Sequence, residues 1–194
     1  MLCLACCAQA AAVETYTYWV EPCTPQAVTA TACDPDDTEL AKWAFETWQR
    51  ESGGLLAFTP ADSEAHARIR LHWANGQGSL YGETRPILVN GRRGAEIYVL
   101  PDTRMLGRDI AVAARADQLF RHAVVYLTCL HESGHALGLE HTAEFADIMY
   151  TFRYGGDIAA YFERYRKLLK TRGDIAKFSG ISDADRVALL KTLK

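Results

Sequence analysis

Three short stretches of the chain have the hydrophobic pattern of β-strands. Residues 15–20 are rich in β-branched and aromatic side chains, and residues 67–73 and 95–100 alternate apolar with polar side chains. A period of two places every second side chain on one face of a sheet, so each stretch predicts a half-buried strand. Between residues 73 and 95, the Gly, Pro and Asn residues predict turns and one further short strand.

A longer period, with apolar residues every three or four positions, predicts helices. Asp34 and Pro35 are typical of the N-cap and first position of a helix, and Gly53 is typical of a helix end. The first helix is therefore predicted between these residues. A second, longer helix is predicted from residue 116 or 117 to about residue 137.

Two more helices are predicted in the last quarter of the chain. One covers residues 157 to about 170, and its apolar side chains indicate a packed core face. The other begins at Ser182, where Asp185 provides an acidic variant of the capping box. Strands followed by a central helix predict a single α+β domain.

Composition is that of a soluble globular protein. The chain has 194 residues, 49% hydrophobic and 23% charged, with a formal net charge of −3. Such a length suits one domain with its own core. The acidic balance and the scattered basic residues exclude nucleic acid and an anionic membrane as expected partners. No run is long enough for a transmembrane segment, and we expect a monomer.

The first residues differ in composition from the rest of the chain. Residues 1–12 carry no charge and are rich in Leu, Cys and Ala, which predicts a secretory signal with a cleavage site near Ala8 to Ala10. A lipid anchor on Cys6 or Cys7 is the alternative. Residues 13–194 would then be the mature, exported domain.

The remaining cysteines fit an exported protein. Cys23 and Cys33 are flanked by turn-forming residues and are candidate disulfide partners if the protein is exported. Two free thiols in a cytosolic protein are the alternative. Cys129 lies in an apolar stretch, which predicts a buried, inert thiol.

The segment 131–141 contains the residues that predict chemistry. It places His131, His135 and His141 in the pattern H-E-x-x-H-x-x-G-x-x-H. Two histidines four positions apart lie on one face of a helix and can share a tetrahedral zinc ion. Gly138 can adopt a left-handed backbone, so the helix ends and His141 returns to the same ion. Three nitrogens leave one coordination position open, as in catalytic zinc sites.

Glu132 follows the first predicted ligand directly and does not need to bind the metal. A carboxylate at this place can act as the general base that takes a proton from the attacking water and passes it to the leaving amine. A purely structural zinc site would need a fourth ligand and would have no use for Glu132. The other histidines, at positions 66, 72 and 122, have no ligand spacing, so we assign them no role.

This segment resembles the metzincin clan of zinc peptidases. Met149, eight residues after the third histidine, is similar to the methionine of the clan's Met-turn, which lies beneath the metal. Within the clan, residues 43–48, 149–150 and 181–185 most resemble the matrixins, the matrix metalloproteinase family. The resemblance implies a zincin-like fold: a twisted mixed sheet, a central active-site helix and a small C-terminal helical subdomain.

The resemblance also implies a zinc-dependent endopeptidase with one catalytic zinc and a peptide or protein substrate. Thr151 stands where matrixins usually carry proline, and residues 73–95 lack their recognisable loop for structural zinc and calcium. Calcium is therefore not supported by the sequence. The segment at residues 151–180 follows the Met-turn, where the family forms the wall of its S1′ specificity pocket, and the resemblance implies a role for it in specificity. We expect the substrate to pair with an edge strand at residues 78–86.

Two other functions remain open at this stage. The first is an interaction module that binds zinc without hydrolysing peptides, against which Glu132 argues. The second is a dedicated processing protease or toxin that cuts one partner protein. A secreted or otherwise extracytoplasmic location, with a lipid anchor as the variant, is expected for each of them.

Overall fold

The computed structural model describes residues 12–76 and 81–193. Within them, five strands form one sheet in the order β2-β1-β3-β5-β4. The strands are β1 (Glu14–Val20), β2 (Leu56–Pro60), β3 (Ile69–Trp73), β4 (Gly82–Val89) and β5 (Arg92–Val99). All neighbours are parallel except β4, which is antiparallel to β5. All but Ala12 of the predicted signal segment lies outside the described residues.

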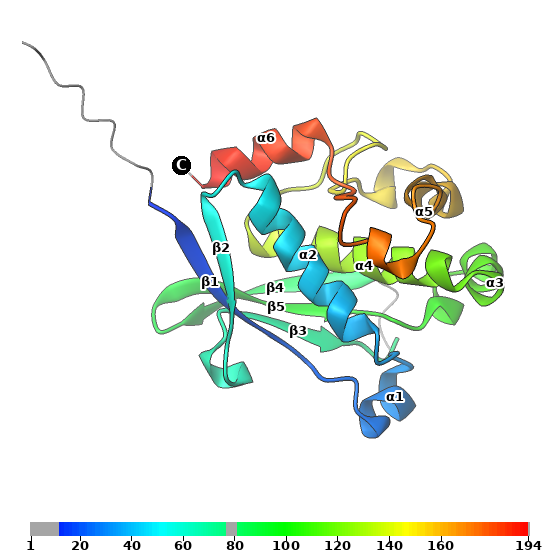
Figure 1. Ribbon diagram of the computed structural model, residues 1–194, viewed down its shortest axis with the longest axis horizontal. Coiled ribbons are helices and arrows are strands. Elements are labelled where there is room, and N and C mark those ends of the chain that lie inside the picture. Colours follow the sequence, from blue (N-terminus) through cyan, green and yellow to red (C-terminus); the bar gives the residue numbers. More distant parts are fainter. Residues whose placement is uncertain (1–11, 77–80, 194) are drawn as a thin grey trace, which may run out of the picture.

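Six helices accompany the sheet, and Figure 1 shows α2 and α4 across one face of it. They are α1 (Pro25–Thr31), α2 (Asp37–Glu51), α3 (Arg108–Ala116), α4 (Gln118–Ala136), α5 (Ile158–Arg166) and α6 (Asp183–Thr192). Short 3-10 turns occupy Glu64–His66, Thr103–Met105, Phe152–Tyr154 and Arg172–Asp174. In the described residues no helix is both long and apolar enough to cross a membrane.

The core lies between the sheet and helices α2 and α4. The side chains that alternate inward from the strands, such as Ile69, Leu71 and Ile97, are fully buried. Trp48 of α2 also donates its indole N–H to the backbone oxygen of Leu130 in α4 at 2.9 Å. The mixed sheet, the central helix and the helical C-terminal part confirm the predicted α+β fold.

Two predicted helix boundaries are wrong. Helix α2 begins at Asp37, so Asp34 is not its N-cap and Pro35 is not its first residue. The Asp34 carboxylate instead accepts the N–H of Asp36, and the Asp37 carboxylate receives two hydrogen bonds from Arg121. With these contacts the chain forms a turn at residues 34–36, and the helix begins after it.

The helix predicted for residues 157–170 ends earlier, at Arg166. The Asp174 carboxylate accepts the N–H groups of Lys170 and Thr171, and so holds the chain in a turn there. The last helix begins as predicted, since Ser182 and Asp185 form a capping box. Helices α1 and α3 and strand β2 were not predicted.

The edge of the sheet also differs from the prediction in its boundaries. The edge strand is β4, at residues 82–89 instead of 78–86, and residues 77–80 are not described. After β1, Cys23 and Cys33 are joined by a disulfide with a Cα–Cα distance of 6.0 Å. This bond closes the loop that contains α1. Cys129 is buried, and burial raises the pKa of its thiol.

Candidate metal centre

Helix α4 positions two of the imidazoles and the carboxylate of the predicted site. The Asp117 carboxylate accepts the N–H groups of Leu119 and Phe120 and caps the start of this helix. At the other end, His131 and His135 lie one turn apart, with ring centroids 4.8 Å from each other. The helix thus places both rings on one face, as the spacing predicts.

Gly138 turns the chain after this helix. Its φ of 96° lies in the left-handed region, which residues with a Cβ rarely adopt. The helix ends at Ala136, and the N–H of Gly138 bonds the carbonyl oxygen of His135 at 2.9 Å. The turn brings the ring of His141 to 4.5 Å from that of His135 and 5.2 Å from that of His131.

The ring nitrogens of the three histidines converge on one point. Nε2 of His141 lies 3.2 Å from Nε2 of His131 and 3.1 Å from Nε2 of His135. Two nitrogens bound tetrahedrally at about 2.0–2.1 Å from zinc would be roughly 3.3 Å apart. Within residues 12–76 and 81–193, these three side chains are the one His, Cys, Asp or Glu group close enough to share an ion.

The backbone fixes the tautomers that metal binding requires. Nδ1 of His131 donates to the carbonyl oxygen of Ile148 at 2.7 Å, and Nδ1 of His135 donates to that of Leu139 at 2.8 Å. Each Nε2 therefore carries a lone pair directed at the shared point. Burial lowers the pKa of His131 to about 3 and also lowers those of His135 and His141. The rings are neutral, so the donor set fits zinc.

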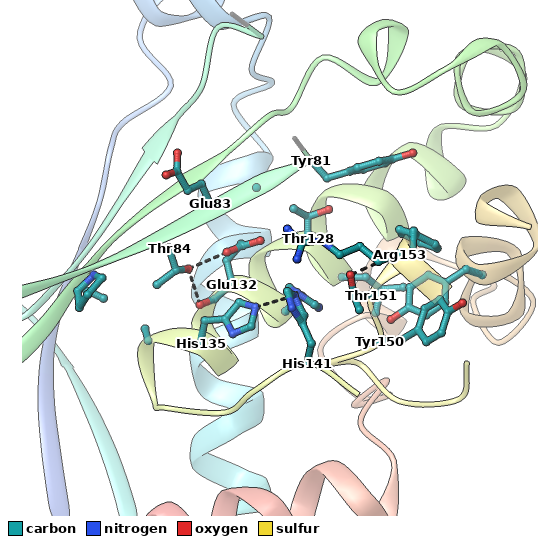
Figure 2. A pocket seen from close by; sticks show the side chains of 18 of the residues that line it. Tyr81, Glu83, Thr84, Thr128, Glu132, His135, His141, Tyr150, Thr151 and Arg153 are labelled. Carbon is teal, nitrogen blue, oxygen red and sulfur yellow. Dashed lines mark hydrogen bonds between the residues drawn. The ribbon is translucent and has the colours of Figure 1, made fainter. Parts of the chain in front are cut away.

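Glu132 lies beside the three imidazoles and is buried in the cleft wall. Burial raises the pKa of its carboxyl group to about 7, although a hydrogen bond from Thr84 acts in the opposite direction. The Thr84 hydroxyl lies 2.7 Å from Oε2 of Glu132. Figure 2 shows this contact, with His135 and His141 next to Glu132. A carboxyl group with a raised pKa can exchange a proton near neutral pH.

Met149 follows Ile148, whose carbonyl oxygen accepts the hydrogen bond from His131, and is almost fully buried. It packs against Gly134 of α4: a Cβ on this glycine would be 2.5 Å from the sulfur of Met149 and 3.0 Å from the ring of Trp48. The close approach of the two segments therefore requires a residue without a side chain. The zinc-binding motif assigns no role to Gly134, although a glycine inside a helical pattern is a signal of close packing.

Residues from the C-terminal helices hold the turn around Met149, which is the second feature that the sequence did not reveal. Asp185 of α6 accepts the N–H of Ile148 at 2.8 Å and that of Met149 at 3.3 Å. Tyr161 of α5 donates its hydroxyl to the carbonyl oxygens of Asp147 and Ile148. The capping pattern identified Asp185, but its spacing gave no sign of this second role.

A cleft of about 710 Å³ opens beside the imidazoles. Its wall is made by β4, β5, α4, the loop at residues 150–153 and α5. Part of the lining is aromatic: Tyr81, Tyr150, Phe152, Tyr161 and Phe162. The cleft can hold an extended chain with at least one bulky apolar group next to the metal centre.

The three histidines without predicted roles lie outside this cleft. His66 contacts Asp62 at 2.7 Å, and His72 stacks on Tyr98 on the sheet. His122 is buried near the start of α4, and burial lowers its pKa. The structure therefore brings together the predicted ligands, Glu132, Gly138 and Met149, and leaves these histidines apart.

Comparison with known protein families supports the same interpretation of the chain. The model of the matrixin family matches residues 12–159, which is more than half of the chain and includes every residue of the segment 131–150. No curated protein and no solved structure shows significant similarity to the chain.

Proposed function

The chain belongs to the matrixin family, and from this premise we propose that it is a zinc-dependent endopeptidase with Glu132 as its general base. The observation that carries the proposal is the convergence of three Nε2 atoms beside an unligated carboxylate. We assign the zinc to His131, His135 and His141.

The roles of the side chains follow from their positions. Bound zinc would supply a Lewis acid and lower the pKa of water. Glu132 would accept a proton from the attacking water and return it to the leaving nitrogen of the peptide bond. The carbonyl groups that hold His131 and His135 keep both rings oriented throughout.

An extended peptide is the substrate that this cleft favours. Strand β4 has one neighbour in the described sheet, β5, so its other edge offers backbone N–H and C=O groups along the cleft. A peptide can add there as a further strand. Ile158, Tyr161 and Phe162 of α5 line the same cleft, which supports a role for this helix in selecting the side chain that follows the cut bond.

The location follows from the family and from the N-terminal composition. Matrixins are generally extracellular. We propose that residues 1–12 direct export and that the domain at 13–194 acts outside the cytoplasm, with a lipid anchor as the variant. A disulfide between Cys23 and Cys33 is stable in such an oxidising compartment.

Peptide-library cleavage with metal removal and restoration tests this function. We expect the zinc-loaded protein to cut library peptides, a chelator to stop cleavage, and added zinc to restore it. Glu132→Ala should keep stoichiometric zinc and lose activity. Zinc uptake with no cleavage by the wild type would instead identify an interaction module, and cleavage of a single partner would identify a dedicated processing protease.

A further inference from the structure

One contact at the cleft joins the edge strand to the general base, and the catalytic motif does not predict it. We propose that Thr84 is a positioning residue, whose hydroxyl holds the carboxylate of Glu132 in its working orientation. The inference rests on the proposed function, because it concerns the base of that reaction. The proposal adds Thr84, a residue of the sheet, to the site residues that lie on α4.

The hydroxyl of Thr84 contacts Glu132 at both ends of that residue. It lies 2.7 Å from Oε2 of the carboxylate and 2.9 Å from the backbone oxygen of Glu132. Two contacts to one residue fix the torsion angles of the side chain between them. Thr84 sits opposite the buried Ile97 of β5 and so faces the helix layer, whereas the flanking Glu83 and Arg85 pair with each other at the surface. Figure 2 shows both contacts of Thr84.

A hydroxyl suits this position because it has one hydrogen to donate and can also accept. The carboxylate and the backbone oxygen of Glu132 both lie within hydrogen-bond distance of the Thr84 hydroxyl. A methyl group in its place could form neither contact.

Gly82, on the same strand as Thr84, also lies against the carboxylate of Glu132. A Cβ at this position would lie 2.6 Å from Cγ and 2.7 Å from Oε1 of Glu132. The strand therefore passes as close to the carboxylate as a residue without a side chain permits. Gly82 leaves the space for Glu132, and Thr84 supplies the hydrogen bond that fixes it there.

The first test compares substitutions at Thr84 in the zinc-loaded full chain. Thr84→Val keeps the shape and removes the hydroxyl, and we expect kcat for a library-derived peptide to fall about tenfold or more while KM changes less than about twofold. Thr84→Ser should restore most of kcat. Thr59→Val, at an exposed position on β2, is the matched control and should behave as wild type. Zinc content and melting temperature should stay at wild-type values in all three.

Wild-type kcat in Thr84→Val would overturn the proposal, as would an equal loss in Thr84→Ser or a loss of zinc. Thr84→Ala serves as the second hydroxyl-free variant if Thr84→Val does not fold. Crystal structures give a readout that does not need activity: Glu132 should leave its position in Thr84→Val and keep it in Thr84→Ser. An unmoved Glu132 in Thr84→Val refutes the role of Thr84, whereas a wild type without zinc-dependent cleavage refutes only the proposed function.

Discussion

Asp185 accepts a hydrogen bond from the backbone N–H of Met149, and so ties the last helix to the turn whose Ile148 carbonyl holds His131. The same carboxylate accepts the N–H of Ile148 and that of Ser182, the N-cap of its own helix. One side chain therefore both starts α6 and anchors the metal centre. We therefore expect both the stability of the fold and the affinity for the metal to depend on Asp185.

Replacing Asp185 with alanine should destabilise the protein by about 2–4 kcal/mol, since it leaves buried N–H groups without their charged acceptor. Urea unfolding of the metal-free protein measures this loss, and zinc titration should show weaker binding. Asp183→Ala, on the same helix but with a side chain 96% exposed, is the control and should cost less than about 0.5 kcal/mol. Equal effects of the two substitutions would contradict the anchoring role.

Gly134→Ala should be destabilising, although alanine is the better helix former. In an open helix the change would stabilise by about 1 kcal/mol. Here the new methyl group meets the sulfur of Met149, and overpacking of this kind costs about 1–3 kcal/mol. Thermal unfolding measures the difference. Gly173→Ala is the control, because the nearest atom to its Cβ would be 3.9 Å away. A higher melting temperature for Gly134→Ala would show that the turn is not packed as described.

Glu132→Gln should stabilise the metal-free protein at alkaline pH. The folded-state pKa of Glu132 is raised to about 7, above the unfolded value of about 4.3. Its contribution to stability is thus complete below the unfolded pKa and is lost as pH rises through 7, because a buried carboxyl group must ionise. Glutamine avoids this loss, and we expect a gain of roughly 1–3 kcal/mol at pH 8 that is absent at pH 4.

Denaturant unfolding of chelated wild type and Glu132→Gln between pH 4 and pH 8 measures that gain. Glu144→Gln, at an exposed position after the third histidine, is the matched control. The three ligand histidines affect both proteins alike, since their lowered pKa values make stability fall as pH drops below about 6.5 in each. A gain that did not vary with pH would contradict the assigned cause.

Phe162 of α5 lines the cleft, so its truncation should change which peptides are cut. Phe162→Ala enlarges the cavity, and we expect the preferred residue after the cut bond to become larger. A peptide-library profile measures the change. Leu168→Ala, just beyond the same helix at a half-exposed position, should leave the profile as it is. An unaltered preference in Phe162→Ala would remove α5 from the specificity pocket.

The local parts of this structure were predictable from the sequence. The helical spacing of His131 and His135, the left-handed turn at Gly138 and the capping box at Ser182 each depend on residues within a few positions of one another. The alternation of residues 67–73 and 95–100 likewise marks two central strands of the sheet. Local patterns of this kind are determined by backbone geometry.

The supports of the site were not predictable, because they join distant segments. Thr84 meets Glu132 across 48 positions, and Asp185 meets Met149 across 36. Strand β2 was missed since its exposed end does not alternate, and the start of α2 was misplaced because Asp37 pairs with Arg121 instead of capping. Each miss reflects a tertiary contact that overrides a local preference.

The order of the chain has a consequence for when the metal centre can be complete. Translation delivers the three histidines before Asp185, which follows Ile148 by 37 positions. A nascent chain that has released its three imidazoles still lacks the carboxylate that secures the turn at residues 148–149. The centre is therefore completed only when the start of α6 has been synthesised and has packed against this turn.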